Sequence, residues 1–257
     1  MFLHKLPFFI SIPHGGKLIP EDLQNDIMLS PFDILEDSDA FTHEIYDMGE
    51  HAKYVFKADI ARAIVDLNRP VDQFPPEFPD GIIKSHTCYG KQIFKQSPSN
   101  DRIESLIQSY YKPYHEQIKH VLTQDPHIEL ALDCHSMASV GPKYSKDTGK
   151  KRPLMCLGNV WGKTCSEPVI TQLSECFCAS FGFKETDIQI NKPFSGGYIT
   201  QTYGMGDIPW IQIEISRELY LSAKYFDPQS LKMDINRLNE LNQMFQAGLM
   251  LYFQKTQ

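Results

Sequence analysis

Residues 8–20 read FFISIPHGGKLIP, an apolar run that ends abruptly at a histidine and two glycines. A short apolar run bounded by turn residues is typical of a buried strand, so we predict a first strand over residues 6–12. The glycines at 15 and 16 allow a tight turn or a close approach to another group. His14 is therefore either an ordinary turn residue or a ligand at the end of a strand, and other segments must decide.

The same pattern recurs further along the chain. HIELALDC, residues 127–134, is a compact apolar run that leads directly to His135. A third run, around residues 210–215, carries Glu214 between two isoleucines. Each of these runs predicts a buried strand with a chemically versatile side chain at or near its end.

Between the strand-like runs lie four segments with the periodicity of amphipathic helices. They are residues 41–48, 101–122 with Asp101 as N-cap and a kink at Pro113, 168–181 and 229–253. Shorter apolar runs at 54–58 and 63–67 are also strand-like, whereas the four prolines of residues 69–81 exclude a helix or central strand there. Alternating strands and helices indicate an α/β sheet covered on both faces, in one domain spanning residues 1–257.

The composition excludes several classes of protein. In 257 residues there are 25 basic and 32 acidic side chains, a net charge of −7 without long runs of either sign. A nucleic-acid or anionic-membrane partner would require a basic surface, so we expect neither. The six cysteines lack paired CxxC spacing, and no apolar run is long enough to span a membrane. We expect a cytoplasmic protein with free thiols; whether it forms a homo-oligomer is left open.

Ligands of open α/β sheets bind at the carboxyl ends of the strands. His14, His135 and Glu214 are therefore expected at one edge of the sheet, where the two imidazoles suit zinc or a similar divalent metal. Asp133 lies two residues before His135, so it points the same way and would support a nearby imidazole. A buried Glu214 needs a partner or a raised pKa, which indicates either a general base or an ion pair with an arginine such as Arg217.

The third metal ligand is less clear from the residues. LEDSDAFTHEIYD, residues 35–47, offers Asp37 and Asp39 among other acidic groups, but acidic residues are also favoured at the start of a helix. Glu21, in the turn that follows His14, is a weaker candidate.

Two segments predict contacts with a substrate. ARAIVDLNRP, residues 61–70, holds Arg62, Asn68 and Arg69, and guanidinium groups bind carboxylates through two parallel hydrogen bonds. The same arginines could instead neutralise acidic neighbours. In FSGGYITQTYG, residues 194–204, Gly196 and Gly197 allow a close backbone approach and Tyr198 could stabilise an oxyanion; the simpler interpretation is a tight turn before a strand.

Two other motifs are set aside. HEQIKH, residues 115–120, has its histidines five positions apart, which does not match a helical zinc motif. Cys134 and His135 are adjacent strand residues that point to opposite faces, so they would not act together as nucleophile and base.

Taken in order, seven short segments resemble the N-formylglutamate amidohydrolase family. They are IPHGG, the DSD of residues 37–39, ARAIVDLNRP, the YYKPYH of residues 110–115, DCHS, FSGGYI and QIEISRELY. The resemblance implies a zinc-dependent hydrolase with a fold similar to zinc carboxypeptidases and aspartoacylases, in which a mixed, twisted sheet lies between helices.

The resemblance also assigns roles. It implies one zinc ion per chain, held by His14, His135 and a carboxylate, with Glu214 as general base. Relatives usually carry the carboxylate three residues after the first histidine, where this chain has Lys17, so the family's acidic motif favours Asp39 over Asp37. The residues that would support the metal ligands from outside are then Asp133, Asp37 and His115. The residues that would bind the substrate are Arg62, Asn68, Arg69, Gly196, Gly197, Tyr198 and Arg217.

The implied reaction is hydrolysis of N-formyl-L-glutamate to formate and L-glutamate, a step of histidine degradation. Two alternatives stay open: a hydrolase of another N-acyl amino acid or small peptide, and a non-catalytic protein that binds a carboxylated ligand on the same scaffold.

Overall fold

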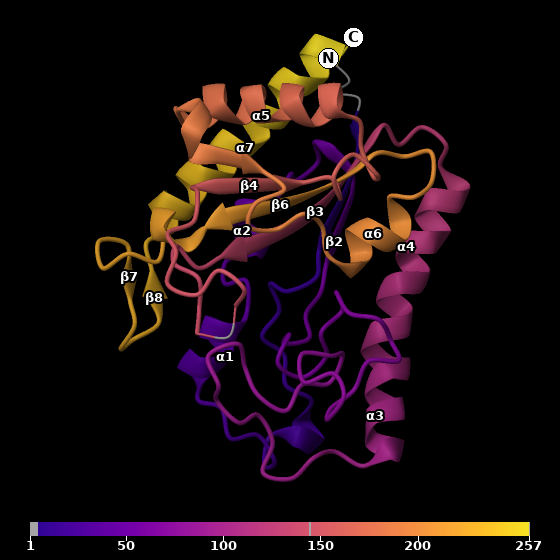
Figure 1. The fold of residues 1–257 in the computed structure, drawn as a ribbon, viewed down its shortest axis with the longest axis vertical. Coiled ribbons are helices and arrows are strands. Elements are labelled where there is room, and N and C mark those ends of the chain that lie inside the picture. The colour runs from indigo at the N-terminus through magenta and orange to yellow at the C-terminus, as the bar shows by residue number, and fades with distance from the viewer. Residues whose placement is uncertain (1–4, 144, 257) are drawn as a thin grey trace.

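A mixed six-stranded sheet forms the centre of the computed structural model, which describes residues 5–143 and 145–256 (Figure 1). The strand order is β2–β1–β3–β6–β4–β5. Strands β2, β1, β3 and β6 run parallel, β4 is antiparallel to β6, and β5 is parallel to β4. The predicted α/β fold with a mixed sheet is confirmed. The strands are β1 Leu6–Ile12, β2 Ala52–Lys57, β3 Leu130–Met137, β4 Met155–Gly158, β5 Ile188–Ile190 and β6 Trp210–Ser216.

Helices cover both faces of the sheet (Figure 1). The first face packs against α2, Thr42–Ile45, α5, Glu167–Phe181, and α7, Ile235–Thr256. The second face packs against α3, Asn100–Leu106, α4, Lys112–Gln124, α6, Tyr198–Tyr203, and the irregular segment 58–94. Each Phe or Ile fully buried in these two layers contributes roughly 1.5–3 kcal/mol to stability.

Alternation along the strands decides which face each side chain reaches. In β3, Leu132 and Cys134 belong to the first core, whereas Ala131 belongs to the second. Asp133 and His135 therefore share the second face, and Cys134 points away from them as predicted. By the same alternation, Glu214 of β6 lies on the second face with the two histidines.

The predicted long helix is divided at its proline. Its N-cap is Ser99, whose hydroxyl accepts a hydrogen bond from the Arg102 amide, so Asp101 lies inside the first turn rather than at the cap. A π-helical turn, Ile107–Tyr111, separates α3 from α4. Pro113 explains this turn, because proline has no amide hydrogen and its ring clashes with the carbonyl four residues earlier.

One predicted strand is wrong, and two predicted helices have other bounds. The segment 63–67 forms no strand but a buried irregular turn, since an apolar run alone does not distinguish the two. The helix predicted over 41–48 is only the single turn of α2. The last helix begins at Ile235, not near residue 229, because the Asp227 carboxylate accepts hydrogen bonds from the Gln229 amide and the Ser230 hydroxyl, which favours a turn. That turn joins β7, Phe226–Asp227, to β8, Lys232–Met233.

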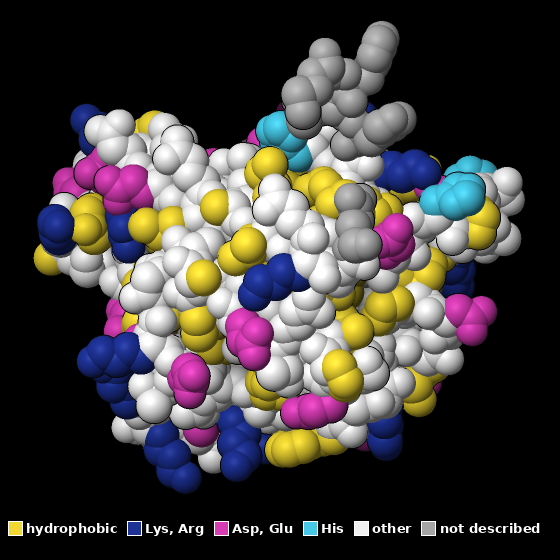
Figure 2. All heavy atoms as spheres, turned by 90° about the horizontal axis from the view of Figure 1, so that it is seen from above, with side chains coloured by type: hydrophobic (Ala, Val, Ile, Leu, Met, Phe, Trp, Pro, Cys, Tyr) yellow, Lys and Arg dark blue, Asp and Glu magenta, His cyan; other side chains and the backbone are white. Residues whose placement is uncertain are grey.

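The surface is of mixed charge. Acidic and basic side chains are interspersed over the face shown in Figure 2. None of the described helices is both long and apolar enough to cross a membrane.

Candidate active site

Three buried side chains from distant segments converge at the carboxyl ends of β1 and β3. Ligand atoms of His14, Asp39 and His135 all lie within 4.8 Å of one another. Asp39 Oδ2 is 2.9 Å from His135 Nδ1 and 3.4 Å from His14 Nδ1. Two imidazole nitrogens and a carboxylate form the donor set of zinc and similar divalent metals. The cluster thus has the composition and spacing of a metal site.

One atom of this cluster independently indicates a cation. His14 Nδ1 is buried and makes no hydrogen bond with any described residue. A buried polar atom left in this way costs about 1–3 kcal/mol. A metal ion at this nitrogen would remove that cost, so the residues present fit a bound metal.

The acidic motif separates its two aspartates. Helix α1, Pro31–Asp37, begins with a capping box between Ser30 and Asp33 and ends at Ser38. Asp37 turns to the buried Lys84 ammonium at 3.4 Å and to the Cys88 amide at 3.0 Å. The Asp39 amide donates to the His14 carbonyl at 2.9 Å, which joins the two ligand segments directly. Asp37 therefore lies outside the cluster, and so does the exposed Glu21.

Each histidine has a carboxylate beside its Nε2, the ring nitrogen that faces away from the cluster. His14 Nε2 lies 2.8 Å from Asp66 Oδ1, and His135 Nε2 lies 3.1 Å from Asp133 Oδ1. Such pairs fix the ring orientation and leave the other nitrogen, here Nδ1, facing the cluster. Asp133 lies where strand alternation placed it. The sequence analysis did not predict a role for Asp66. The signal was present, because Asp66 is a single acidic residue inside the apolar run 63–67, just as Glu214 is in its own run.

Asp66 is the centre of a buried ionic network. Arg62 Nε lies 3.0 Å from Asp66 Oδ2, Lys84 Nζ lies 3.6 Å away and Arg69 Nη2 lies 4.0 Å away. Burial alone would raise the pKa of Asp66, but Arg69, His14, Arg62 and Lys84 together hold it well below the ordinary value. Asp66 is therefore ionised and can hold His14.

The charges of Asp39 and His135 depend on one another. Burial alone would raise the pKa of Asp39, but the hydrogen bond with His135 and the nearby imidazole of His14 keep that pKa well below the ordinary value. Burial would likewise lower the pKa of His135, and the Asp133 and Asp39 carboxylates reverse this and raise it well above the usual range. A divalent cation bound among these groups would favour the neutral imidazole and take the place of a proton there.

Glu214 lies in the register position opposite His135 on the neighbouring strand. Its Oε1 accepts a hydrogen bond from Gln212 Nε2 at 2.8 Å, and Gln212 Oε1 in turn accepts from the Gly197 amide. Burial raises the pKa of Glu214 to about 7. No cation of the described residues lies within ion-pair distance of Glu214, so the alternative of an ion pair with Arg217 is wrong. Gln212 is a site residue that the sequence analysis missed.

Most of the hydrogen-bonding capacity of Arg217 is used within the protein. Its guanidinium donates to the Ser136 hydroxyl, to the carbonyls of Glu36 and Ser38, and to Asp39 Oδ1. Four of its five N–H groups are thus used by the chain itself. One N–H group of Arg217 is left, and its role in substrate binding stays a prediction.

Asn68 connects the substrate-binding segments to the histidines. Its Nδ2 lies 3.2 Å from His135 Nε2, and its Oδ1 accepts from the Ile199 amide at 2.7 Å. A Cβ at Gly197 would lie 2.4 Å from Asn68 Nδ2, so only glycine permits this approach. Gly196, with φ of +133°, precedes it. The segment that follows is helix α6, so the alternative of a tight turn leading directly into a strand is wrong.

The remaining predicted residues lie around this centre. Arg62 contacts Asp66, which in turn contacts His14 of the cluster. The Arg62 side chain is 18% exposed. Arg69 is held by Asp80, with Nη2 2.6 Å from Oδ2 and Nε 2.7 Å from the carbonyl. Half-buried Tyr198 begins α6, with its ring 5.8 Å from that of His115. His115 binds the Leu67 carbonyl and the Tyr203 hydroxyl, so it supports the 67–69 segment and not the metal cluster.

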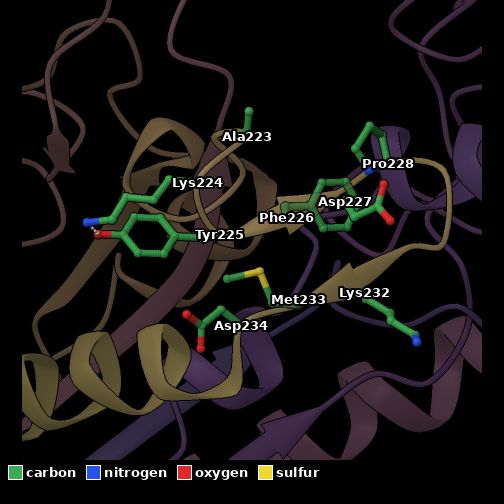
Figure 3. Close-up of a pocket in the computed structure, with 9 residues that line it drawn as sticks. All are labelled: Ala223, Lys224, Tyr225, Phe226, Asp227, Pro228, Lys232, Met233 and Asp234. Carbon is green, nitrogen blue, oxygen red and sulfur yellow. Dashed lines mark hydrogen bonds between the residues drawn. The ribbon is translucent and has the colours of Figure 1, made fainter.

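Two surface depressions lie outside this centre. One of about 560 Å³ is formed by the β7–β8 hairpin and the residues before it, where Lys224 and Tyr225 contact one another (Figure 3). It contains none of the predicted site residues. The other, of about 290 Å³, begins at Gly15, directly after His14, and includes His43 and Asp59.

An α/β sheet that carries a buried His–Asp–His cluster and a glutamate at its edge has the residues that metal-dependent hydrolases use. Residues 6–221 match the family model described as N-formylglutamate amidohydrolase. The chain belongs to this family, which confirms the resemblance and makes it an amidohydrolase.

Individual relatives agree with this assignment. The chain is 27% identical to the N-formylglutamate deformylase of Pseudomonas putida, over 95% of this chain and 93% of that protein. It is 25% identical to the N-formylglutamate deformylase of Pseudomonas aeruginosa, over 86% and 84%. The crystal structure of N-formylglutamate amidohydrolase from Ralstonia eutropha JMP134 matches with a TM-score of 0.80 at 20% identity, over 97% and 94% of the two chains. This last likeness concerns the fold alone.

Proposed function

We propose that the protein is a zinc-dependent hydrolase of N-formyl-L-glutamate, which it converts with water to formate and L-glutamate. The observation that carries the proposal is the buried cluster of His14, Asp39 and His135 with Glu214 opposite His135. The names of the relatives supply the substrate. The six free cysteines fit the reducing cytoplasm that we propose as its compartment, and the reaction would serve histidine degradation.

The chain's own residues account for the proton transfers. Zinc held by His14, Asp39 and His135 would supply a Lewis acid that polarises the amide carbonyl and acidifies water. Ionised Glu214 accepts a proton as water attacks the formyl carbon, and then delivers it to the departing amine nitrogen. Gln212 holds Oε1 of Glu214, which leaves Oε2 to carry this proton. The amide C–N bond breaks, and formate and the free amine result.

Cationic and polar side chains beside this centre suit a substrate with two carboxylates. Arg62 and Arg69 flank the buried turn that ends at Asn68, and Arg69 uses three of its five N–H groups within the chain. We assign the substrate carboxylates to these two arginines. Tyr198 is then the group that stabilises the oxyanion of the tetrahedral intermediate.

The direct test is formate release from N-formyl-L-glutamate. We expect formate and L-glutamate in equal amounts, activity lost after treatment with a chelator, and activity restored by zinc. N-acetyl-L-glutamate and N-formyl-L-leucine are matched controls for the acyl group and the second carboxylate, and each should lower kcat/KM by about 10²-fold or more. Preference for a control identifies another N-acyl substrate, and binding of the formyl compound without formate release overturns the proposal in favour of a non-catalytic protein.

Activity should fall on the acid side of a pH profile. Burial raises the pKa of Glu214 to about 7, and only the ionised carboxylate can accept a proton. Lowering the pH protonates it, so kcat/KM decreases. A cation bound beside His135 would favour the ionised form of Glu214, and the decrease in kcat/KM would then occur at lower pH. Measuring kcat/KM between about pH 4.5 and 8 checks the direction, and a rise toward low pH contradicts the role given to Glu214.

A further inference from the structure

We propose that Arg217 is a positioning residue that presents Asp39 to the metal through a single oxygen. The two oxygens of the Asp39 carboxylate have different surroundings. Oδ2 faces both histidines, at 2.9 and 3.4 Å. Oδ1 faces the other way, 3.1 Å from Arg217 Nη2 and 3.4 Å from the Ser136 hydroxyl. With Oδ1 occupied by hydrogen bonds, Oδ2 is the oxygen left for a metal.

The guanidinium also fixes the backbone that carries Asp39. Arg217 Nη1 donates to the Glu36 carbonyl at 2.7 Å, and Nη2 donates to the Ser38 carbonyl at 2.6 Å. These carbonyls lie at the end of α1, immediately before Asp39. The planar fork of arginine can make such divergent bonds at once, whereas the single nitrogen of lysine cannot.

Arg217 joins this turn to the two strands that carry His135 and Glu214. It is the first residue after β6, and its Nε donates to the Ser136 hydroxyl of β3 at 3.0 Å. Ser136 follows His135 directly. One largely buried side chain therefore connects the end of β6, the end of β3 and the Asp39 turn.

The position of Asp39 needs such support because it does not come from the segment of the first histidine. Lys17, three residues after His14, has no carboxylate, and its Nζ lies 4.7 Å from the centre of the Phe41 ring. Asp39 lies 25 positions after His14, between α1 and α2, outside any helix or strand. Its place beside the histidines is thus set by tertiary contacts. Arg217 contributes a bond to Oδ1 and two bonds to the backbone that precedes Asp39.

This inference rests on the proposed zinc site, and its test measures metal binding without substrate. We would compare the zinc affinity of the wild type, Arg217→Gln and Arg217→Lys by competition with a chelating indicator. Loss of an outer partner of a metal ligand lowers metal affinity by about 10–100-fold. We expect a loss of that size for Arg217→Gln and a smaller loss for Arg217→Lys, which keeps the charge.

Arg237→Gln is a matched control. Arg237 is also largely buried, and it donates to the Leu219 carbonyl at 2.8 Å and to Glu240 at 2.9 Å, but it does not touch the Asp39 turn. Its replacement should lower thermal stability and leave zinc affinity within about threefold of the wild type. The visible spectrum of the cobalt-substituted protein gives a second readout, which should change in Arg217→Gln and not in Arg237→Gln.

Unchanged zinc affinity and an unchanged cobalt spectrum in Arg217→Gln overturn the inference, as does a wild type that binds no zinc. If Arg217→Gln does not fold, Ser136→Ala removes the other donor to Asp39 Oδ1 and must weaken zinc binding for the inference to stand. A wild type that binds zinc but releases no formate rejects the proposed reaction and leaves the role of Arg217 intact.

Discussion

Replacing Glu214 with glutamine should reduce formate release by about 10²–10⁴-fold while the metal stays bound. The carboxamide has nearly the same shape, and its oxygen can still accept the hydrogen bond from Gln212. It cannot accept a proton from water, so the loss should appear in kcat. Metal content per chain, measured on the same sample, separates a lost base from a lost metal.

Glu218→Gln is the control for this prediction. Glu218 is four residues further along, 34% exposed, and its ion-pair partner is Lys151 at 4.0 Å on the surface. Its replacement should leave turnover within about threefold, because exposed ion pairs contribute little. Normal turnover in Glu214→Gln would reject Glu214 as the base and require another proton acceptor.

Removal of either histidine should empty the metal site. Zinc sites in small folded domains contribute about 10–16 kcal/mol through four ligands, so one ligand is worth on the order of 3–4 kcal/mol, or about 10²–10³-fold in affinity. His14→Ala and His135→Ala should therefore lose zinc on dialysis and lose activity with it. Zinc analysis after dialysis and the formate assay check both effects.

Both variants should remain folded, because the supporting carboxylates keep other partners. Asp66 retains Arg62 and Lys84, and Asp133 retains the hydroxyls of Ser11 and Thr200. His120→Ala, on the exposed side of α4, is the control and should keep a full zinc content. Retention of one zinc per chain by both His14→Ala and His135→Ala would show that the metal binds elsewhere.

The strand pattern predicted the centre of the site because a parallel sheet aligns the ends of its strands. His14, His135 and Glu214 each belong to an apolar run long enough to recognise, and the observed register brings them to one edge. The strands β4 and β5, of four and three residues, are too short for a visible period. Helix α6 was missed for a similar reason, since its six residues begin directly after two glycines.

Contacts between distant segments could not be predicted in this way. Lys84 lies in an irregular segment, yet it is almost fully buried between Asp37 and Asp66. Arg217 looked like a substrate ligand because arginines suit carboxylates, but its carboxylate partner is Asp39, 178 positions earlier. Such pairs depend on how the irregular segments pack over the sheet. This packing cannot be predicted from the periodicity or the spacing of residues in the sequence.

The strand that carries Glu214 also completes the sheet, and this has a consequence for folding. In the order β2–β1–β3–β6–β4–β5, strand β6 alone among the described strands links the parallel strands to the β4–β5 pair. Until residues 210–216 are in place, β3 has one unpaired edge and β4 cannot join the sheet. Such pairing across a long stretch of chain is intrinsically slow and leaves strand edges open to aggregation. A chain that stops before β6 would therefore lack a finished sheet as well as the glutamate that we propose as its general base.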